Sequence, residues 1–273
     1  MKIERVCALY FSGTGTTRSM VMTIAEALAR ELDVPLREIP FTRPGERDRE
    51  YYFTGAELLV VGCPTYAGRL PNKIMPDLRN KLHGKDTISV PVVMFGNRGY
   101  ENSLAELTAL LTENGFFPAA AAACVAQHAF TDTLAYGRPG WSDQFEAKNF
   151  AKSAARKVKT LSELVEPVRV PGDPNAPYYI PLGEDGAPVN FLKAKPKTKL
   201  SRCNRCGACA RMCPMGTIDK KDVTAVTGTC IKCQTCVRRC TKQAKYFDDP
   251  AFLSHVAMLE KTCAEPKENE WFL

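Results

Sequence analysis

The sequence lacks any long apolar segment. No apolar run in its 273 residues approaches the about 20 residues that a membrane-spanning helix requires. Residues 1–6 lead directly into a strand-like run, without the apolar stretch and small-residue cleavage site of a signal peptide. We therefore expect a cytoplasmic protein that has no membrane span.

Histidine is also scarce, which argues against a histidine-based metal site. The three histidines, His83, His128 and His255, are isolated, and none of them has the spacing of a metal ligand. We expect each of them to be a surface or capping residue.

Cysteine, in contrast, is abundant and unevenly distributed. Eight of the twelve cysteines lie between Cys203 and Cys240, and the other four are scattered. Disulfides are rare in a reducing cytosol, so a dense group of cytosolic cysteines indicates bound metal. The cysteine-rich segment is therefore the first candidate for a metal site.

The eight grouped cysteines form two runs with the same spacing, Cys-x2-Cys-x2-Cys-x3-Cys, and the second run follows the first by 27 residues. In bacterial two-cluster ferredoxins, runs of this spacing bind two [4Fe–4S] clusters, and the fourth cysteine of each run ligates the other cluster. The pattern predicts two clusters with crossed ligands. Cluster I takes Cys203, Cys206, Cys209 and Cys240, and cluster II takes Cys230, Cys233, Cys236 and Cys213.

Structural zinc is the alternative interpretation, because zinc sites also use Cys-x2-Cys pairs. Zinc sites combine two such pairs across a longer gap, whereas here three cysteines share one tight run and a fourth follows. The spacing therefore favours iron–sulfur clusters. Thr241 stands where proline usually follows the fourth cysteine, which removes no ligand.

The cysteine-rich segment is also strongly basic. Residues 197–247 contain twelve Lys or Arg residues and two Asp. A nucleic-acid surface would need aromatic residues among the basic ones, and only Tyr246 and Phe247 are present. Each four-thiolate cluster carries a net negative charge that these cations partly offset. We expect no nucleic-acid binding, and we expect the remaining surplus to dock an acidic redox partner protein.

The first 165 residues or so alternate strand-like and helix-like segments, which predicts an α/β fold with a parallel sheet. The predicted strands are residues 3–11, 36–41, 58–63, 89–95 and 119–126. The predicted helices are residues 16–32, 73–82, 101–114 and 143–164.

A proline-rich segment separates this region from the cysteines. Residues 167–199 contain seven prolines and no periodicity, which indicates a linker or a wrapping arm. An ordered arm is expected, because four of its side chains, Tyr178, Tyr179, Ile180 and Phe191, are apolar enough to dock. The predicted division is an α/β domain at 1–166, the arm at 167–199, a cysteine domain at 200–249, and a C-terminal helix and tail at 250–273.

A loop rich in glycine and hydroxyl groups, residues 10–18, follows the first predicted strand. Free N–H groups at the start of a helix bind phosphate. The loop lacks the third glycine of the dinucleotide fingerprint and the Gly-Lys-Ser/Thr of a P-loop. Its hydroxyls suit a terminal phosphate monoester held without a metal, and a Ser/Thr-rich helix cap is the alternative. The hydroxyls belong to Ser12, Thr14, Thr16 and Thr17.

The motif Ser12-x-Thr14-Gly15-x-Thr17 resembles the phosphate loop of flavodoxins, which bind FMN. The resemblance extends through residues 62–68 and 95–100, where flavodoxin loops bracket the isoalloxazine ring. Residues 128–133 are a further candidate to approach it. The resemblance implies an FMN site made of Ser12, Gly13, Thr14, Gly15, Thr16, Thr17, Pro64, Thr65, Tyr66, Ala67, Gly68, Gly96, Asn97, Arg98, Gly99 and Tyr100. Its candidates for ring stacking are Tyr66 and Tyr100.

Residues 1–250 as a whole resemble the flavodoxin–ferredoxin fusion proteins of anaerobes, the EFR-type ferredoxin family. The resemblance implies a flavodoxin-like doubly wound parallel sheet of order 2-1-3-4-5, followed by a small α+β ferredoxin-like domain with two [4Fe–4S] clusters. It also implies an electron carrier that links FMN and the clusters to partner redox enzymes. The alternative is an oxidoreductase that uses NAD(P)H or reduces a small acceptor at the FMN. We assign no catalytic residue.

Overall fold

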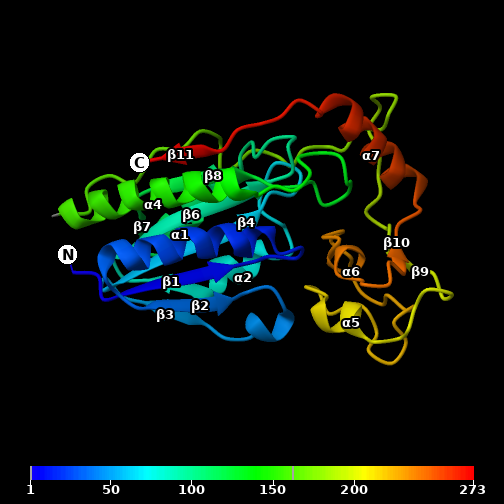
Figure 1. Cartoon of the computed structure of the whole chain (residues 1–273), viewed down its shortest axis with the longest axis horizontal. Coiled ribbons are helices and arrows are strands. Elements are labelled where there is room, and N and C mark those ends of the chain that lie inside the picture. The colour runs from blue at the N-terminus through cyan, green and yellow to red at the C-terminus, as the bar shows by residue number, and fades with distance from the viewer. Residues whose placement is uncertain (1, 162) are drawn as a thin grey trace.

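The computed structural model describes residues 2–161 and 163–273, and its N-terminal part is built on one large sheet. The main path of the sheet runs β11-β8-β6-β4-β1-β2, and the strands from β8 to β2 are parallel (Figure 1). In chain order these five strands are arranged 2-1-3-4-5, so the predicted flavodoxin-like fold is confirmed. The strands are β1 (Arg5–Tyr10), β2 (Leu36–Pro40), β4 (Glu57–Pro64), β6 (Thr87–Phe95) and β8 (Ala121–Val125).

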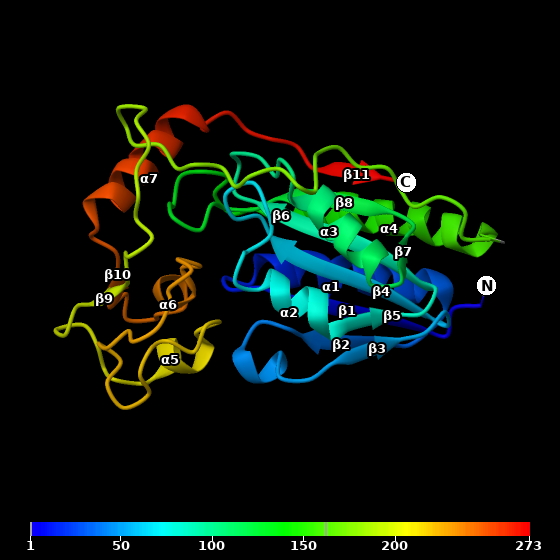
Figure 2. The ribbon, with the colours of Figure 1, turned by 180° about the vertical axis from the view of Figure 1, so that it is seen from behind.

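These strands are apolar along most of their length because helices cover both faces of the sheet. In β1, Val6 and Ala8 belong to one apolar core, and Cys7 and Leu9 belong to the other. Helices α1 and α4 cover the first face, and α2 and α3 cover the second (Figures 1 and 2). Their bounds are α1 (Thr16–Leu32), α2 (Met75–Lys81), α3 (Ser103–Glu113) and α4 (Trp141–Thr160).

Short elements complete the α/β domain. Strand β7 extends the sheet beside β6, β3 pairs with β5, and a 3-10 helix at Pro44–Glu46 precedes β3. Among the residues that the structure describes, no helix combines the length and the apolar character needed to cross a membrane. The short strands are β3 (Tyr51–Phe53), β5 (Leu82–Gly84) and β7 (Phe116–Pro118).

The proline-rich segment is an ordered arm along the α/β domain (Figure 2). The Arg69 guanidinium donates to the carbonyl oxygen of Pro174 at 2.7 Å, and the N–H of Tyr179 donates to the carbonyl oxygen of Ala67 at 2.9 Å. These contacts match the wrapping arm and not a free linker. Ile180 does not dock as expected, since its side chain is exposed.

The cysteine domain repeats its sequence pattern in its backbone. Each half carries one short helix, α5 (Ala208–Met212) or α6 (Thr235–Arg238), which begins directly after a residue with left-handed φ. An antiparallel pair, β9 (Lys197–Thr198) and β10 (Lys245–Tyr246), completes the domain. Positive φ angles recur at three pairs of positions with the offset of the cysteine runs, Arg205 and Lys232, Gly207 and Gln234, and Gly216 and Gln243.

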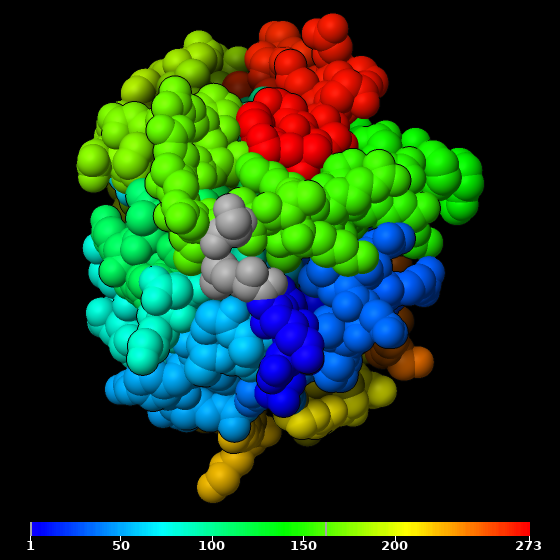
Figure 3. Space-filling view, turned by 90° about the vertical axis from the view of Figure 1, so that its left-hand side faces the viewer, coloured from blue at the N-terminus to red at the C-terminus, as the bar shows by residue number. Residues whose placement is uncertain are grey.

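The chain returns to the α/β domain after the cysteine domain. Helix α7 (Pro250–Thr262) leads to β11 (Glu270–Phe272), which pairs antiparallel with β8 at the edge of the sheet. Figure 3 shows this red segment beside the green α4, where the rings of Trp271 and Phe150 lie 5.0 Å apart. The sequence predicted the helix but not the strand. The cysteine domain is therefore connected to the α/β domain through both of its ends.

Candidate functional site

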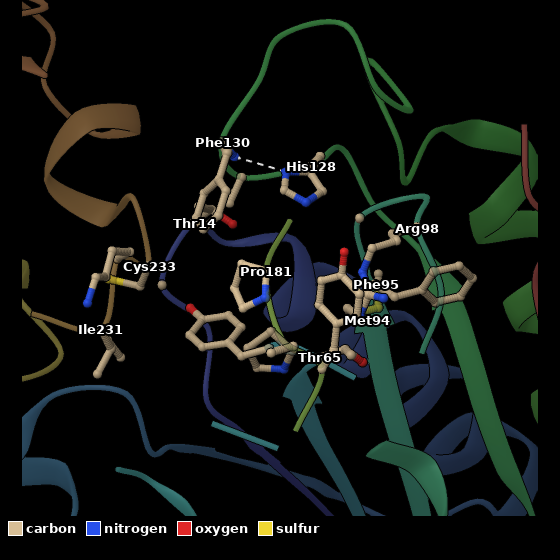
Figure 4. Close-up of a pocket in the computed structure, with 18 of the residues that line it drawn as sticks. Thr14, Thr65, Met94, Phe95, Arg98, His128, Phe130, Pro181, Ile231 and Cys233 are labelled. Carbon is tan, nitrogen blue, oxygen red and sulfur yellow. Dashed lines mark hydrogen bonds between the residues drawn. The ribbon is translucent and has the colours of Figure 1, made fainter. Parts of the chain in front are cut away.

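A cavity of about 670 Å³ lies at the carboxyl ends of the central parallel strands. Its volume is within the range of cavities that bind cofactors and other small molecules. Three loops that the sequence singled out meet here, after β1, β4 and β6 (Figure 4). The predicted flavin-site residues that line the cavity are Gly13, Thr14, Thr16, Thr17, Pro64, Thr65, Tyr66, Ala67, Gly96, Arg98 and Gly99.

The loop between β1 and α1 leaves donors free at one end of this cavity. Gly15 is the N-cap of α1 with a φ of 106°, and as a glycine it has no side chain with which to cap the helix. The first turn of α1 contains no acidic residue, so its positive dipole end and the N–H groups of Thr16 and Thr17 are open to an anion. Ser12 has a different role, because its Oγ accepts a hydrogen bond from the N–H of Arg18 at 3.0 Å. The capping interpretation thus describes Ser12, whereas Thr14, Thr16 and Thr17 face the cavity.

Two predicted flavin contacts hold the C-terminal tail instead of lining the cavity. The Asn97 side-chain amide donates to the carbonyl oxygens of Cys263 at 2.7 Å and Glu265 at 3.0 Å. The Tyr100 hydroxyl donates to Glu270 Oε2 at 2.7 Å. Tyr100 is therefore not placed to stack on a ring in the cavity, in contrast to the expectation. The carboxylate of Glu270 lies too far away in sequence for the motif to reveal this contact.

Two glycines of the predicted site act through the backbone alone. Gly15 and Gly68 have positive φ angles of 106° and 76°, which favour glycine because a side chain would be strained there. A Cβ at Gly68 would also collide with the side chain of Glu101. Neither glycine lines the cavity, so each shapes a loop whose neighbours do.

The arm supplies a side of the cavity that the motifs did not reveal. Tyr178, Tyr179 and Phe191 line it together with Pro181. The Tyr178 hydroxyl donates to the carbonyl oxygen of Leu70 at 2.8 Å, and the Arg98 guanidinium lies 4.0 Å from the centre of the Tyr179 ring. The aromatic residues among the prolines were the signal for docking, but the sequence did not say where they dock.

Two histidines line the same cavity; His255 is buried and His128 is half-buried. His128 Nδ1 accepts a hydrogen bond from the N–H of Phe130 at 3.2 Å (Figure 4). Burial, with help from nearby His255 and Arg98, lowers the pKa of His128 to about 4. Burial also lowers the pKa of His255, whose Nδ1 lies 2.8 Å from the carbonyl oxygen of Leu182. The expectation of a surface or capping residue is wrong for the buried His255, whereas the half-buried His128 caps the N–H of Phe130 and also reaches the cavity.

The ligand set proposed for cluster II surrounds a second, smaller cavity. Cys213 from the first run lies there with Cys230, Cys233 and Cys236 from the second run, as crossed ligation requires. The N–H of Lys232 donates to Cys230 Sγ at 3.4 Å. Burial raises the pKa of Cys233 to about 11, so its thiol holds its proton until a metal displaces it.

The ligand set proposed for cluster I is nearer to solvent. Cys206 is exposed, and N–H groups approach two others, since Arg205 N donates to Cys203 Sγ at 3.4 Å and Ala244 N donates to Cys240 Sγ at 3.3 Å. Among residues 2–161 and 163–273, no three His, Cys, Asp or Glu side chains converge on a point that could hold a single metal ion. A four-iron cluster is wider than one ion, because each cysteine binds a different iron atom.

The two cavities share one segment of the chain as part of their lining. The segment from Thr229 to Cys233 lines the large cavity beside the loop after β1, and Cys230 and Cys233 also line the small one (Figure 4). A Cβ at Gly13 would lie 3.3 Å from the Cβ of Cys233. Burial and the nearby thiol of Cys233 raise the pKa of the Tyr66 hydroxyl. Two ligands of one proposed cluster are therefore in direct contact with the proposed flavin cavity.

Comparison with known proteins gives one family match. Residues 196–219, which contain the first cysteine run, match the family described as a 4Fe-4S binding domain. No curated protein matches the chain.

Several solved structures resemble the α/β part at low identity. A flavodoxin from the domain Archaea is 16% identical, with 57% of this chain and 99% of that chain covered and a TM-score of 0.37. A flavodoxin of Streptococcus pneumoniae TIGR4 is 20% identical, with 56% and 99% covered and a TM-score of 0.38. Rubredoxin oxygen:oxidoreductase of Desulfovibrio gigas is 20% identical, with 58% and 37% covered and a TM-score of 0.41. The fold assignment rests on the strand order and not on these likenesses.

Proposed function

From a chain that joins a flavodoxin-like domain to a 4Fe-4S binding domain, we propose an electron-transfer protein that binds FMN and two [4Fe–4S] clusters. It passes electrons between them and partner redox enzymes. The observation that carries this proposal is the shared segment from Thr229 to Cys233, which borders both the flavin cavity and the ligand set of cluster II. Electron tunnelling falls steeply with distance, and this contact brings the two cofactor sites together.

The residues of the large cavity fit FMN. At one end, the hydroxyls of Thr14, Thr16 and Thr17 and the N–H groups of α1 suit a phosphate. Elsewhere in its lining, Tyr66 and Tyr179 offer aromatic surface to a planar ring. When bound, FMN exchanges one or two electrons, whereas each cluster passes one at a time. The chain would thereby match a two-electron donor to one-electron acceptors.

The cysteines fit two clusters in a reducing compartment. Both runs offer four thiols, and N–H groups point at several of the sulfurs, which stabilises the thiolate form. All twelve cysteines are free of disulfides. We therefore propose a cytoplasmic location, where thiols stay reduced.

We propose that the redox partner docks on the surface around the ligands of cluster I. Its ligand Cys206 is exposed, and the exposed basic residues Arg205 and Arg211 lie in the same run. The Arg211 guanidinium donates to the carbonyl oxygen of Cys206 at 2.9 Å. A positive surface next to a solvent-facing cluster suits an acidic redox protein.

Cofactor content after anaerobic purification tests the proposal. We expect about eight irons, about eight sulfides and about one FMN per chain. The absorption spectrum should contain both flavin and iron–sulfur bands. FMN without iron, or zinc in place of iron, would refute electron transfer between the two sites.

A flavin-dependent oxidoreductase is the second candidate, and one observation favours it. The cavity extends beyond the flavodoxin-like loops to Phe130, Phe191, Leu259 and the two histidines, which leaves apolar surface for a small acceptor. Steady anaerobic turnover with NAD(P)H and a small acceptor, without a partner protein, would support this function. Turnover that requires a partner protein would support the carrier.

A further inference from the structure

The cysteine domain touches the phosphate end of the cavity through helix α6 and the residue that follows it. If Gly13 carried a Cβ atom, this atom would lie 2.7 Å from Thr235 Oγ1. A Cβ atom on Gly15 would lie 2.4 Å from Arg239 Nη2. Both separations are shorter than van der Waals contact. The Arg239 guanidinium therefore rests against the loop that precedes α1.

The side chain of Arg239 is exposed, and it lies beside the cavity lining rather than in it. In the part of the chain that the structure describes, no carboxylate or carbonyl oxygen accepts a hydrogen bond from it. Other arginines near the cavity are already paired: Arg18 with Glu38 at 2.8 Å, and Arg98 with Glu101. Arg239 is thus a cation beside an anion-binding helix start, and the structure gives it no anion of its own.

We propose that Arg239 donates to the phosphate group of FMN, so that the flavin site is completed by a residue of the cysteine domain. This inference rests on the proposed function. The α/β domain supplies hydroxyls and N–H groups from Thr14 to Thr17, and Arg239 adds a positive charge that is not already paired, as that of Arg18 is with Glu38. An arginine can hold a phosphate through two parallel N–H donors.

The position of Arg239 depends on the cluster ligands. It directly precedes Cys240 and follows Cys236 by three residues, so it lies between a ligand of each proposed cluster. Neighbouring Arg238 fixes α6 to the cavity, because its guanidinium donates to the carbonyl oxygens of Ala129 at 3.1 Å and Thr131 at 2.5 Å. FMN affinity should therefore depend on the folded cysteine domain, and the coupling is reciprocal.

Titration of the full chain with two flavins tests this inference. The chain carries its clusters and is freed of flavin, and quenching of flavin fluorescence reports binding of FMN or of riboflavin, which lacks the phosphate. We expect Arg239→Gln to weaken FMN binding by about tenfold or more, as for the loss of a hydrogen bond to a charged group. Riboflavin binding should change by less than about twofold, because the ring site is intact.

Two further variants make the result specific. Arg202→Gln removes an exposed arginine of the same domain that, unlike Arg239, is not a neighbour of Gly15, and it should leave the affinity for both flavins unchanged. Arg239→Lys keeps the charge and should restore part of the FMN affinity. The iron content and the melting temperature of Arg239→Gln should equal those of the wild type, which shows that the variant is folded.

The outcomes separate this inference from the function on which it rests. Unchanged FMN affinity in Arg239→Gln, or an equal loss for FMN and riboflavin, would overturn the role of Arg239 and leave the flavin site in place. A wild-type chain that binds neither flavin would overturn the proposed function itself. A higher salt concentration should weaken FMN binding more in the wild type than in Arg239→Gln, and equal salt dependence would count against the contact.

Discussion

The α/β domain buries an apolar core on each face of its sheet, with fully buried side chains such as Leu58 in one core and Leu107 in the other. The cysteine domain has a core of four buried residues, Ala210, Ile218, Val223 and Cys236. A segment of about 50 residues with so small a core buries too little apolar surface to fold alone. The α/β domain is therefore stabilised by its own apolar cores, whereas the cysteine domain needs other sources of stability.

Contacts with the α/β domain supply part of what the cysteine domain lacks. Besides the bonds of Arg238, Arg47 Nη2 donates to the carbonyl oxygen of Pro214 at 2.8 Å, and the tail pairs with β8. Metal ligation supplies the rest, because crossed ligands tie the two cysteine runs together. Loss of the metal, loss of one ligand, truncation of a core and a change of pH should therefore affect the two domains differently.

Removal of the metal should unfold one domain and leave the other. We expect anaerobic chelation to abolish protection from hydrogen exchange across residues 197–249, because binding of metal and folding are one event there. The strands of the α/β domain, from β1 to β8, should keep their protection, since their cores contain no metal ligand. Equal loss in both domains, or in neither, would contradict the comparison.

A single cysteine should remove one of the two clusters. Cys213→Ser takes a ligand from the set around the smaller cavity, so we expect iron to fall from about eight to about four per chain. Cys263→Ser, in the tail and outside both runs, is the matched control and should retain all of the iron. Iron that stays near eight in Cys213→Ser would refute crossed ligation.

A core truncation should affect the two domains unequally. Leu107→Ala should lower the free energy of unfolding of the α/β domain by about 2–5 kcal/mol, because its side chain is fully buried. Ile218→Ala, in the small core, should cost less than about half as much while the clusters are bound. Denaturant unfolding, followed by α/β fluorescence and by cluster absorbance, measures both. Equal losses would show that apolar packing contributes as much in the cysteine domain.

Acid should destabilise the α/β domain through His128. Its pKa is about 4 in the folded chain and 6.5 in the unfolded chain, so the unfolded state binds the proton first. Stability is complete above pH 6.5 and falls by about 3 kcal/mol as the pH drops to 4. Denaturant unfolding across this pH range should show the loss in the wild type and a smaller loss in His128→Asn. Identical pH profiles would contradict a His128 that stays neutral in the folded chain.

Local sequence determined most of the architecture. The alternation of apolar strands with amphipathic helices predicted the five parallel strands and their covering helices, because periodicity reports which faces are buried. The offset of 27 residues predicted two similar halves, and left-handed residues such as Gly207 and Gln234 recur with it. The loop after β1 pointed to a phosphate because its hydroxyls and glycines are adjacent in the chain.

The tertiary structure decided which side chains surround the cavity. Tyr100 belongs to a predicted flavin loop but bonds Glu270 of the tail, and His255 reaches the cavity from α7. The contact between Arg239 and the loop at Gly15 joins segments more than 200 residues apart. Periodicity and spacing describe neighbours along the chain, whereas these contacts depend on how complete elements pack, and packing is set by the whole surface of each element.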